Sequence, residues 1–181
     1  MDEGPLVTLA ERLAGLGIDV LRFEFPYMQA RRRGETTTPL DEDEALADCF
    51  VEACKGFSHP GRRIIGGWSL GGRIAALAAP RLEIDGLLCL SYPFHPIRDP
   101  SQGGAIESLR RLQIPTLIVQ GSRDAFGNRE QVRGYSLGEA IQVCWLEDAN
   151  HAFRPRKSSG HTYAGHLQQA IQASETFIRN R

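Results

Sequence analysis

Short apolar runs alternate with helical patterns along the whole chain, and this order restricts the fold more than any single motif. Gly86-Leu87-Leu88-Cys89-Leu90 is apolar throughout, which is typical of a strand buried on both faces of a sheet. Other strands are predicted at residues 18–25, 62–68, 115–120 and 141–146. Helices are predicted at residues 5–16, 41–53, 70–79, 105–112 and 129–137, and a long helix ends the chain. The pattern predicts a three-layer α/β fold with a mainly parallel sheet of about five strands.

Residues 26–40 are predicted to form a loop, because prolines and a glycine interrupt a polar run that has no usable period. This run includes Arg31-Arg32-Arg33. Such a cluster can recognise a carboxylate or phosphate, but a solvated run of charges is the commoner case.

Length and charge narrow the class of protein. A chain of 181 residues fits one domain, so residues 1–181 are expected to form a single α/β domain. Lysine and arginine total 21 against 22 aspartate and glutamate, so we expect neither a nucleic-acid nor a membrane partner. The acidic start lacks a signal-peptide pattern, and the four cysteines form no CxxC pair. These features favour a cytoplasmic protein with reduced, structural cysteines.

The segment Gly67-Trp68-Ser69-Leu70-Gly71 matches G-x-S-x-G and lies between a predicted strand and a predicted helix. A serine hydroxyl is a weak nucleophile unless a base accepts its proton and a strained turn presents it clear of the sheet. The glycines beside Ser69 would tolerate that turn, and the backbone N–H of Leu70 would face a developing oxyanion. The pattern alone also fits an ordinary tight turn. Its position after a strand favours Ser69 as a nucleophile.

An acid and a base follow later strands in the order that such a fold requires. Asp124 follows residues 115–120 and His151 follows residues 141–146, so we predict a triad of Ser69, Asp124 and His151. Asp124 could instead cap the helix that starts near Asn128, and Asp148 is a rival acid that more plausibly shapes the turn.

Four other histidines compete with His151 for the role of base, but only His151 follows the last predicted strand in chain order; the four are His59, His95, His161 and His166. His161 and His166 stand five residues apart, which is off the spacing for a shared metal, and both are expected at the surface. We expect neither a metal nor another cofactor.

The segments RFEFPY, GGWSLGGRIAA, LSYPFHP, IPTLIVQGSRDAFG and DANHAF resemble those of small α/β hydrolases. The resemblance is to dienelactone-hydrolase-like proteins and the group of testis-expressed protein 30. It implies the α/β-hydrolase fold, with nucleophile, acid and base at Ser69, Asp124 and His151. It also implies hydrolysis of an ester, thioester or related acyl bond in a small molecule.

Several aromatic residues lie near predicted strand ends, where α/β sheets bind ligands. Trp68, Tyr27, Phe94, His95 and Phe126 are therefore candidates for an acyl pocket. The alternative for each is that it only packs a loop onto the sheet.

The chain begins at the first helix, whereas members of the resembled fold place a strand and a glycine-rich oxyanion loop before it. Three explanations are open: the natural chain starts earlier, the flanking strands pair directly, or another copy fills the gap in a homodimer. Without that loop we expect reduced activity. A non-catalytic scaffold that binds a small molecule or protein is therefore the alternative function, and an acyltransferase would use the same residues.

Overall fold

The computed structural model describes residues 5–35, 42–57, 59–101 and 104–180. The chain divides into two compact units, Met1–Gly61 and Arg62–Arg181.

The first unit contains three helices: α1 (Pro5–Gly15), α2 (Pro26–Arg32) and α3 (Asp43–Gly56). Helix α1 ends as the sequence predicted, because Gly17 has a φ of 79° that favours glycine. The N–H of Ile18 then donates to the carbonyl of Leu13 at 3.1 Å and closes the helix end. Helix α3 has Asp43 and Glu44 in its first turn, where negative charge stabilises a helix N-terminus.

The strand predicted at residues 18–25 is not present; this stretch has irregular structure. Its two phenylalanines pack against each other and against a helix instead of pairing in a sheet. The ring of Phe23 lies 5.2 Å from the rings of both Phe25 and Phe50 of α3, edge to face in each case. Val20 and Leu21 of the same stretch are exposed, so the predicted strand is replaced by a segment in which only the phenylalanines pack inward.

The loop predicted at residues 26–40 is also corrected, because α2 covers residues 26–32. Pro26 occupies the first turn of this helix, where its missing N–H costs nothing and its fixed φ is already helical. The sequence interpretation took this proline as a breaker. Residues 36–41 of the same stretch lie outside the described residues.

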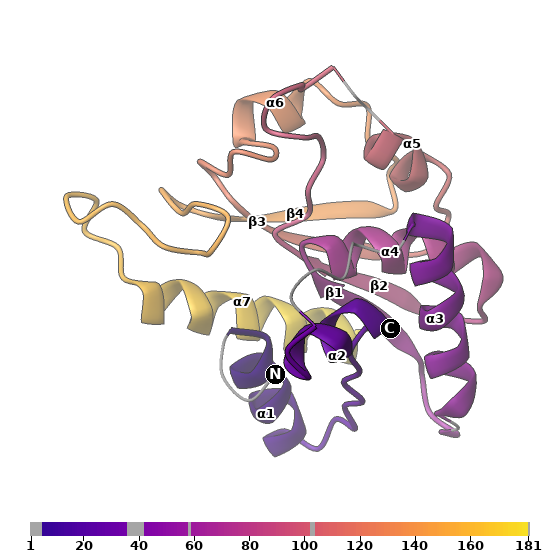
Figure 1. Cartoon of the computed structure of the whole chain (residues 1–181). Coiled ribbons are helices and arrows are strands. Elements are labelled where there is room, and N and C mark those ends of the chain that lie inside the picture. Colours follow the sequence, from indigo (N-terminus) through magenta and orange to yellow (C-terminus); the bar gives the residue numbers. More distant parts are fainter. Residues whose placement is uncertain (1–4, 36–41, 58, 102–103, 181) are drawn as a thin grey trace. The chain divides into compact units, whose positions relative to one another are not determined.

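The second unit is built on a parallel sheet with the strand order β1-β2-β3-β4 (Figure 1). The strands are β1 (Ile64–Trp68), β2 (Gly86–Leu90), β3 (Thr116–Gly121) and β4 (Ile141–Leu146). The sheet of about five strands is therefore corrected to four within the described residues, since residues 18–25 do not join it. The helices of this unit are α4 (Leu70–Ala78), α5 (Gly104–Arg110), α6 (Arg129–Arg133) and α7 (Tyr163–Arg179), with a 3-10 turn at Ala79–Arg81.

Helices α4 and α7 cover opposite faces of this sheet. A Cβ built on Gly72 of α4 would meet Cys89, and one built on Gly86 would meet Phe177 of α7. Gly86 and Cys89 are three residues apart on β2, so they face opposite sides. Strands β2 and β3 are buried at every residue between these two layers. The predicted three-layer α/β arrangement is confirmed.

Because the strands are parallel, their carboxyl ends meet at one edge of the sheet. The residues that follow β1, β3 and β4 include Ser69, Asp124 and His151. Among the described residues, no helix is both long and apolar enough to cross a lipid bilayer.

Candidate active site

Ser69 lies in the turn between β1 and α4 and has an unusual backbone conformation. Its φ is 51° and its ψ is −117°, a region that costs non-glycine residues conformational energy. The turn is held on both sides: the Ser69 N–H donates to the carbonyl of Leu90 at 2.8 Å, and the N–H of Arg73 donates to the Ser69 carbonyl at 3.1 Å. Leu70 is the first residue of α4, so its N–H has no partner within the helix.

The glycines around Ser69 are not equivalent. A Cβ on Gly67 would lie 2.5 Å from the carbonyl carbon of Gly71 and 2.8 Å from the N of Gly72. A Cβ on Gly72 would lie 3.0 Å from the oxygen of Gly67, whereas one on Gly71 would meet nothing within 4 Å. The steric requirement therefore falls on Gly67 and Gly72, and not on the second glycine of the motif.

Of the three residues predicted as a triad, His151 lies within hydrogen-bond distance of both Ser69 and Asp124. His151 Nε2 is 2.8 Å from Ser69 Oγ, and His151 Nδ1 is 2.8 Å from Asp124 Oδ2. A carboxylate can only accept, so the tautomer with its proton on Nδ1 donates to Asp124 and leaves Nε2 free to accept from the serine hydroxyl. The Asp124 side chain is completely buried, while that of His151 is 27% exposed.

Both oxygens of Asp124 have further donors. Its Oδ1 accepts from the N–H of Phe126 at 2.9 Å, and its Oδ2 accepts from Gln120 Nε2 at 3.0 Å. The alternative that Asp124 caps α6 is wrong. Asn128 is the cap, because its side chain accepts from the N–H of Gln131 at 2.9 Å.

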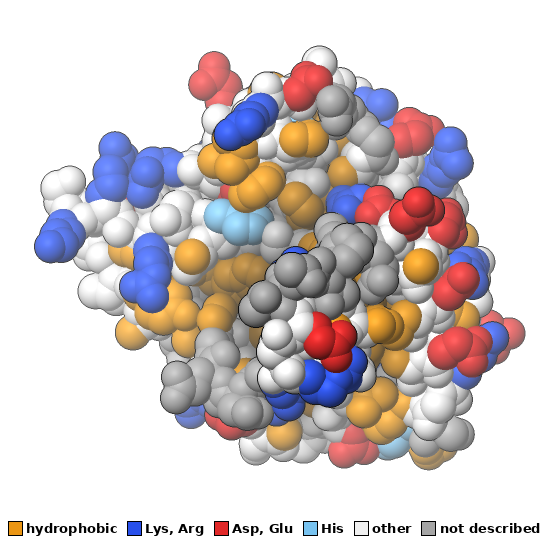
Figure 2. Space-filling view, viewed as in Figure 1, with side chains coloured by type: hydrophobic (Ala, Val, Ile, Leu, Met, Phe, Trp, Pro, Cys, Tyr) orange, Lys and Arg blue, Asp and Glu red, His pale blue; other side chains and the backbone are white. Residues whose placement is uncertain are grey.

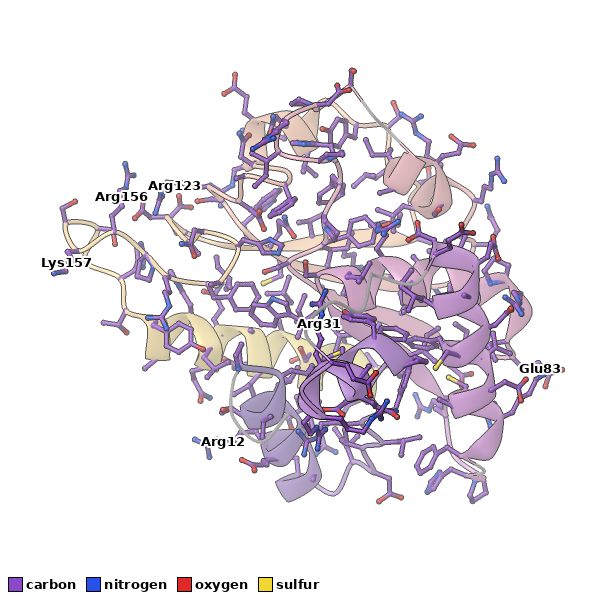
Figure 3. The ribbon with its side chains drawn as sticks, in the orientation of Figure 1. Arg12, Arg31, Glu83, Arg123, Arg156 and Lys157 are labelled. Carbon is purple, nitrogen blue, oxygen red and sulfur yellow. The ribbon has the colours of Figure 1, made fainter. Side chains whose placement is uncertain are left out.

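Asp148, the rival acid, forms ion pairs away from the serine. It pairs with Arg123 Nε at 2.8 Å and with Arg156 Nε at 2.7 Å, and its Oδ2 accepts from the Arg156 N–H at 2.8 Å. The hydrogen bond from the Arg156 guanidinium holds the pKa of the Asp148 carboxyl well below its usual range. The two arginines lie near each other on the loops after β3 and β4 (Figure 3). Asp148 thus shapes the turn before His151, as the sequence indicated.

Basic side chains are prominent around this part of the molecule. Figure 2 shows Lys and Arg side chains over the loop that follows β4. Arg129, the first residue of α6, also pairs with Glu147 of the loop after β4 at 2.8 Å.

The loop that carries His151 is fixed by two polar side chains. Ser91 Oγ donates to the backbone carbonyl of His151 at 2.6 Å, and Ser91 is fully buried with a φ of 50°. Asn150 Oδ1 accepts from the N–H groups of Ala152 and Arg154, each at 3.0 Å. The sequence analysis missed Ser91 and Gln120. The available signal was a polar residue at the end of an otherwise apolar strand.

The two histidines near the start of α7 differ from each other, and the predicted surface location of His166 is wrong. His166 is only 3% exposed, and its Nδ1 lies 2.9 Å from the carbonyl of Phe153. It shares the buried face of α7 with Ala170 and Ile171. His161 is exposed, as expected. No group of three potential metal ligands occurs in the described part of the chain.

The pocket candidates of the second unit fall into two sets: Phe126 and Trp68 are partly exposed, whereas Phe94 and His95 are buried. The Phe126 ring lies 4.5 Å from the His151 ring, and the Trp68 ring lies 4.4 Å from that of Phe153. Phe94 is fully buried against Tyr92 and Tyr135, and His95 is 2% exposed.

Tyr27 belongs to the first unit, where its ring stacks on Phe25 at 6.2 Å. Phe126 and Trp68 are therefore the candidates that the second unit places beside Ser69 and His151.

Comparison with known protein families identifies the family to which this fold belongs. Residues 1–179 match the family described as "Alpha/beta hydrolase domain". The chain belongs to the alpha/beta hydrolase family. Solved structures similar to this alpha/beta hydrolase include an alpha-beta serine hydrolase homologue from Coxiella burnetii. Its sequence is 22% identical, and the two structures superpose with a TM-score of 0.70. The match covers 99% of this chain and 77% of the homologue.

Two further structures share the fold of this alpha/beta hydrolase. XC6422 from Xanthomonas campestris, a serine hydrolase without a lid, has 22% identity and a TM-score of 0.64, covering 99% of this chain and 75% of that one. Est1E from Butyrivibrio proteoclasticus has 17% identity and a TM-score of 0.65, and the match covers 99% of this chain and 82% of Est1E. No protein of curated function matches the sequence.

Proposed function

We propose that this chain is a serine hydrolase that cleaves an ester, thioester or related acyl bond in a small molecule. One observation carries the proposal: a single imidazole, that of His151, lies 2.8 Å from both the Ser69 hydroxyl and the buried Asp124 carboxylate. A serine, a base and an orienting acid in this arrangement are what nucleophilic acyl transfer needs.

In the proposed mechanism, His151 Nε2 takes the proton of Ser69 Oγ while the oxygen attacks the substrate carbonyl carbon. Asp124 stabilises the imidazolium that forms. The tetrahedral oxyanion accepts a hydrogen bond from the N–H of Leu70. When the intermediate collapses, the acyl–leaving-group bond breaks and the leaving group takes the proton from Nε2. Water then attacks the acyl-serine with the same help from His151, releasing a carboxylic acid and restoring the Ser69 hydroxyl.

The family membership supports a hydrolase, and the finer resemblance to dienelactone-hydrolase-like proteins and the group of testis-expressed protein 30 belongs to this proposal. Among the structural neighbours, Est1E binds ferulic acid, at 18% identity and a TM-score of 0.54 to this chain. A carboxylic acid is the kind of product that hydrolysis of an ester releases. Short acyl esters and methyl ferulate are therefore the first substrates to test.

The test is covalent labelling with a fluorophosphonate, together with hydrolysis of p-nitrophenyl acetate and methyl ferulate. We expect labelling of the wild-type protein and its complete loss in Ser69→Ala. Ser158→Ala removes an exposed hydroxyl elsewhere and is the matched control, expected to be labelled like the wild type. His151→Ala should fail to be labelled, whereas His161→Ala, which changes an exposed histidine, should be labelled normally.

If the folded wild-type protein takes up no label, the proposal is wrong and the scaffold alternative gains support. If label is taken up but survives in Ser69→Ala, another residue is the nucleophile. Acyltransferase chemistry would use the same acyl-serine, so products should be analysed with and without added alcohols and amines.

A further inference from the structure

Gln120 is a polar residue in the buried strand β3, next to its carboxyl end. The side chain is completely buried. Its Nε2 donates to Asp124 Oδ2 at 3.0 Å and lies 3.2 Å from the carbonyl oxygens of Tyr92 and Gly127. Its carboxamide therefore links the loop after β2, the loop after β3 and the acid that faces His151.

We propose that Gln120 is a positioning residue that fixes the plane of the Asp124 carboxylate and so orients the imidazole of His151. The inference rests on the proposed serine hydrolase function. The Asp124 carboxylate has one anchor on each oxygen, the Phe126 N–H on Oδ1 and the Gln120 N–H on Oδ2. Two anchors prevent rotation of the carboxylate about its last bond. Oδ2 then stays 2.8 Å from His151 Nδ1 and selects the tautomer that can accept the serine proton.

The unsatisfied half of the carboxamide argues against a purely structural role. Gln120 Oε1 is buried and has no hydrogen-bond partner among the described residues. Burying an acceptor without a partner destabilises a protein, so the oxygen of the carboxamide does not explain why a polar residue stands here. The N–H groups are the part of the residue that does something specific, and one of their three acceptors is the proposed catalytic acid.

The short separation of Gln120 and Asp124 in the sequence also supports a specific contact between their side chains. Gln120 and Asp124 are four positions apart in the sequence, and the connecting chain turns sharply after β3. In that turn the N–H of Asp124 donates to the carbonyl of Gly121 at 3.1 Å. The turn brings the acid back over the end of its own strand, where Gln120 is the side chain that meets it.

The test is Gln120→Met, which keeps an unbranched side chain of similar size but removes both N–H donors. Hydrogen bonds to charged groups are the stronger class, so we expect the rate of fluorophosphonate labelling and kcat for p-nitrophenyl acetate to fall roughly 10- to 100-fold. KM should change little, because Gln120 is buried away from any substrate. Gln120→Leu also removes the donors, and it should lose at least as much activity.

The matched control is Thr116→Val on the same strand. Thr116 is also fully buried, lies four residues earlier and so faces the same side, and its hydroxyl bonds only to the carbonyl of Ile114 in the described structure. It should keep wild-type labelling. Thermal unfolding of each variant separates lost fold from lost function.

A double-mutant cycle with Asp124→Asn tests whether Gln120 acts through Asp124. If Gln120 acts through the acid, Gln120→Met should have almost no further effect in the Asp124→Asn background. Effects that multiply would overturn the positioning role, as would wild-type labelling of Gln120→Met. If Gln120→Met does not fold, Gln120→Leu is carried through the same cycle. Absence of labelling in the wild type would instead show that the proposed function itself is wrong.

Discussion

Alanine at the two glycines of the G-x-S-x-G motif should have opposite effects on stability. A Cβ on Gly67 would lie 2.5 Å from the carbonyl carbon of Gly71 and 2.8 Å from both its oxygen and the N of Gly72. All three contacts are with backbone atoms, so no flexible side chain can move aside. The turn must open, and overpacking of this kind costs about 1–3 kcal/mol.

Gly71→Ala is the matched substitution four residues away. Gly71 is in helix α4, and its built Cβ meets nothing within 4 Å. Alanine there should stabilise the protein by about 0.5–1 kcal/mol, because glycine loses more backbone freedom in a helix.

Thermal unfolding and fluorophosphonate labelling measure the two consequences. For a chain of this size, about 1 kcal/mol corresponds to roughly 2–4 °C in Tm. Gly67→Ala should therefore lower Tm by several degrees and slow labelling, since the Ser69 N–H can no longer hold its 2.8 Å bond to Leu90. Gly71→Ala should raise Tm slightly. A wild-type Tm and labelling rate in Gly67→Ala would contradict the predicted backbone clash. So would a loss of stability in Gly71→Ala as large as that in Gly67→Ala.

Three further predictions concern residues around the site. Ser91→Ala removes the 2.6 Å hydrogen bond to the His151 carbonyl and should destabilise the protein by about 1–3 kcal/mol and slow labelling; unchanged urea midpoint and labelling would contradict it. The depressed pKa of Asp148 means that its ion pairs stabilise the fold above about pH 4 and that this contribution is lost as the pH falls. The stability difference between wild type and Asp148→Asn should therefore shrink between pH 6 and pH 3 in urea titrations, and a constant difference would refute the assignment. Burial raises the pKa of the Cys89 thiol, so iodoacetamide should modify it only after unfolding, as mass spectrometry of native and denatured samples can show.

Strands buried on both faces were the most predictable parts of the fold. Residues 86–90 form a strand with the predicted bounds and are buried at every position, because an apolar run of this kind between turn residues has few alternatives in a parallel sheet. Residues 141–146 also form a strand with the predicted bounds, although this edge strand is only partly buried. Residues 18–25 show the limit of the same reasoning. An apolar stretch of this length predicts a strand, but Phe23 and Phe25 pack against each other instead, and Phe23 also packs against Phe50 of α3.

Motif order placed Ser69, Asp124 and His151 at one edge of the sheet, and the structure brings their side chains together. What surrounds them was not predictable in the same way. Ser91 meets His151 across 60 residues of sequence, and that contact exists only once β2 and the loop after β4 are in place. Gln120 is close to Asp124 in sequence, but its role depends on the turn that folds back over β3.

The strand order has a consequence for how this site forms in time. Ser69 and His151 are 82 residues apart in sequence, and β2 and β3 lie between the strands that carry them. Contacts of such long sequence separation form slowly, because the chain entropy of closing the loop must be overcome first. Their hydrogen bond therefore requires every strand of the second unit to have docked. During refolding, we expect the reactivity of Ser69 to return with the slowest phase. The rate at which fluorophosphonate labelling recovers would therefore measure the rate at which the sheet is completed.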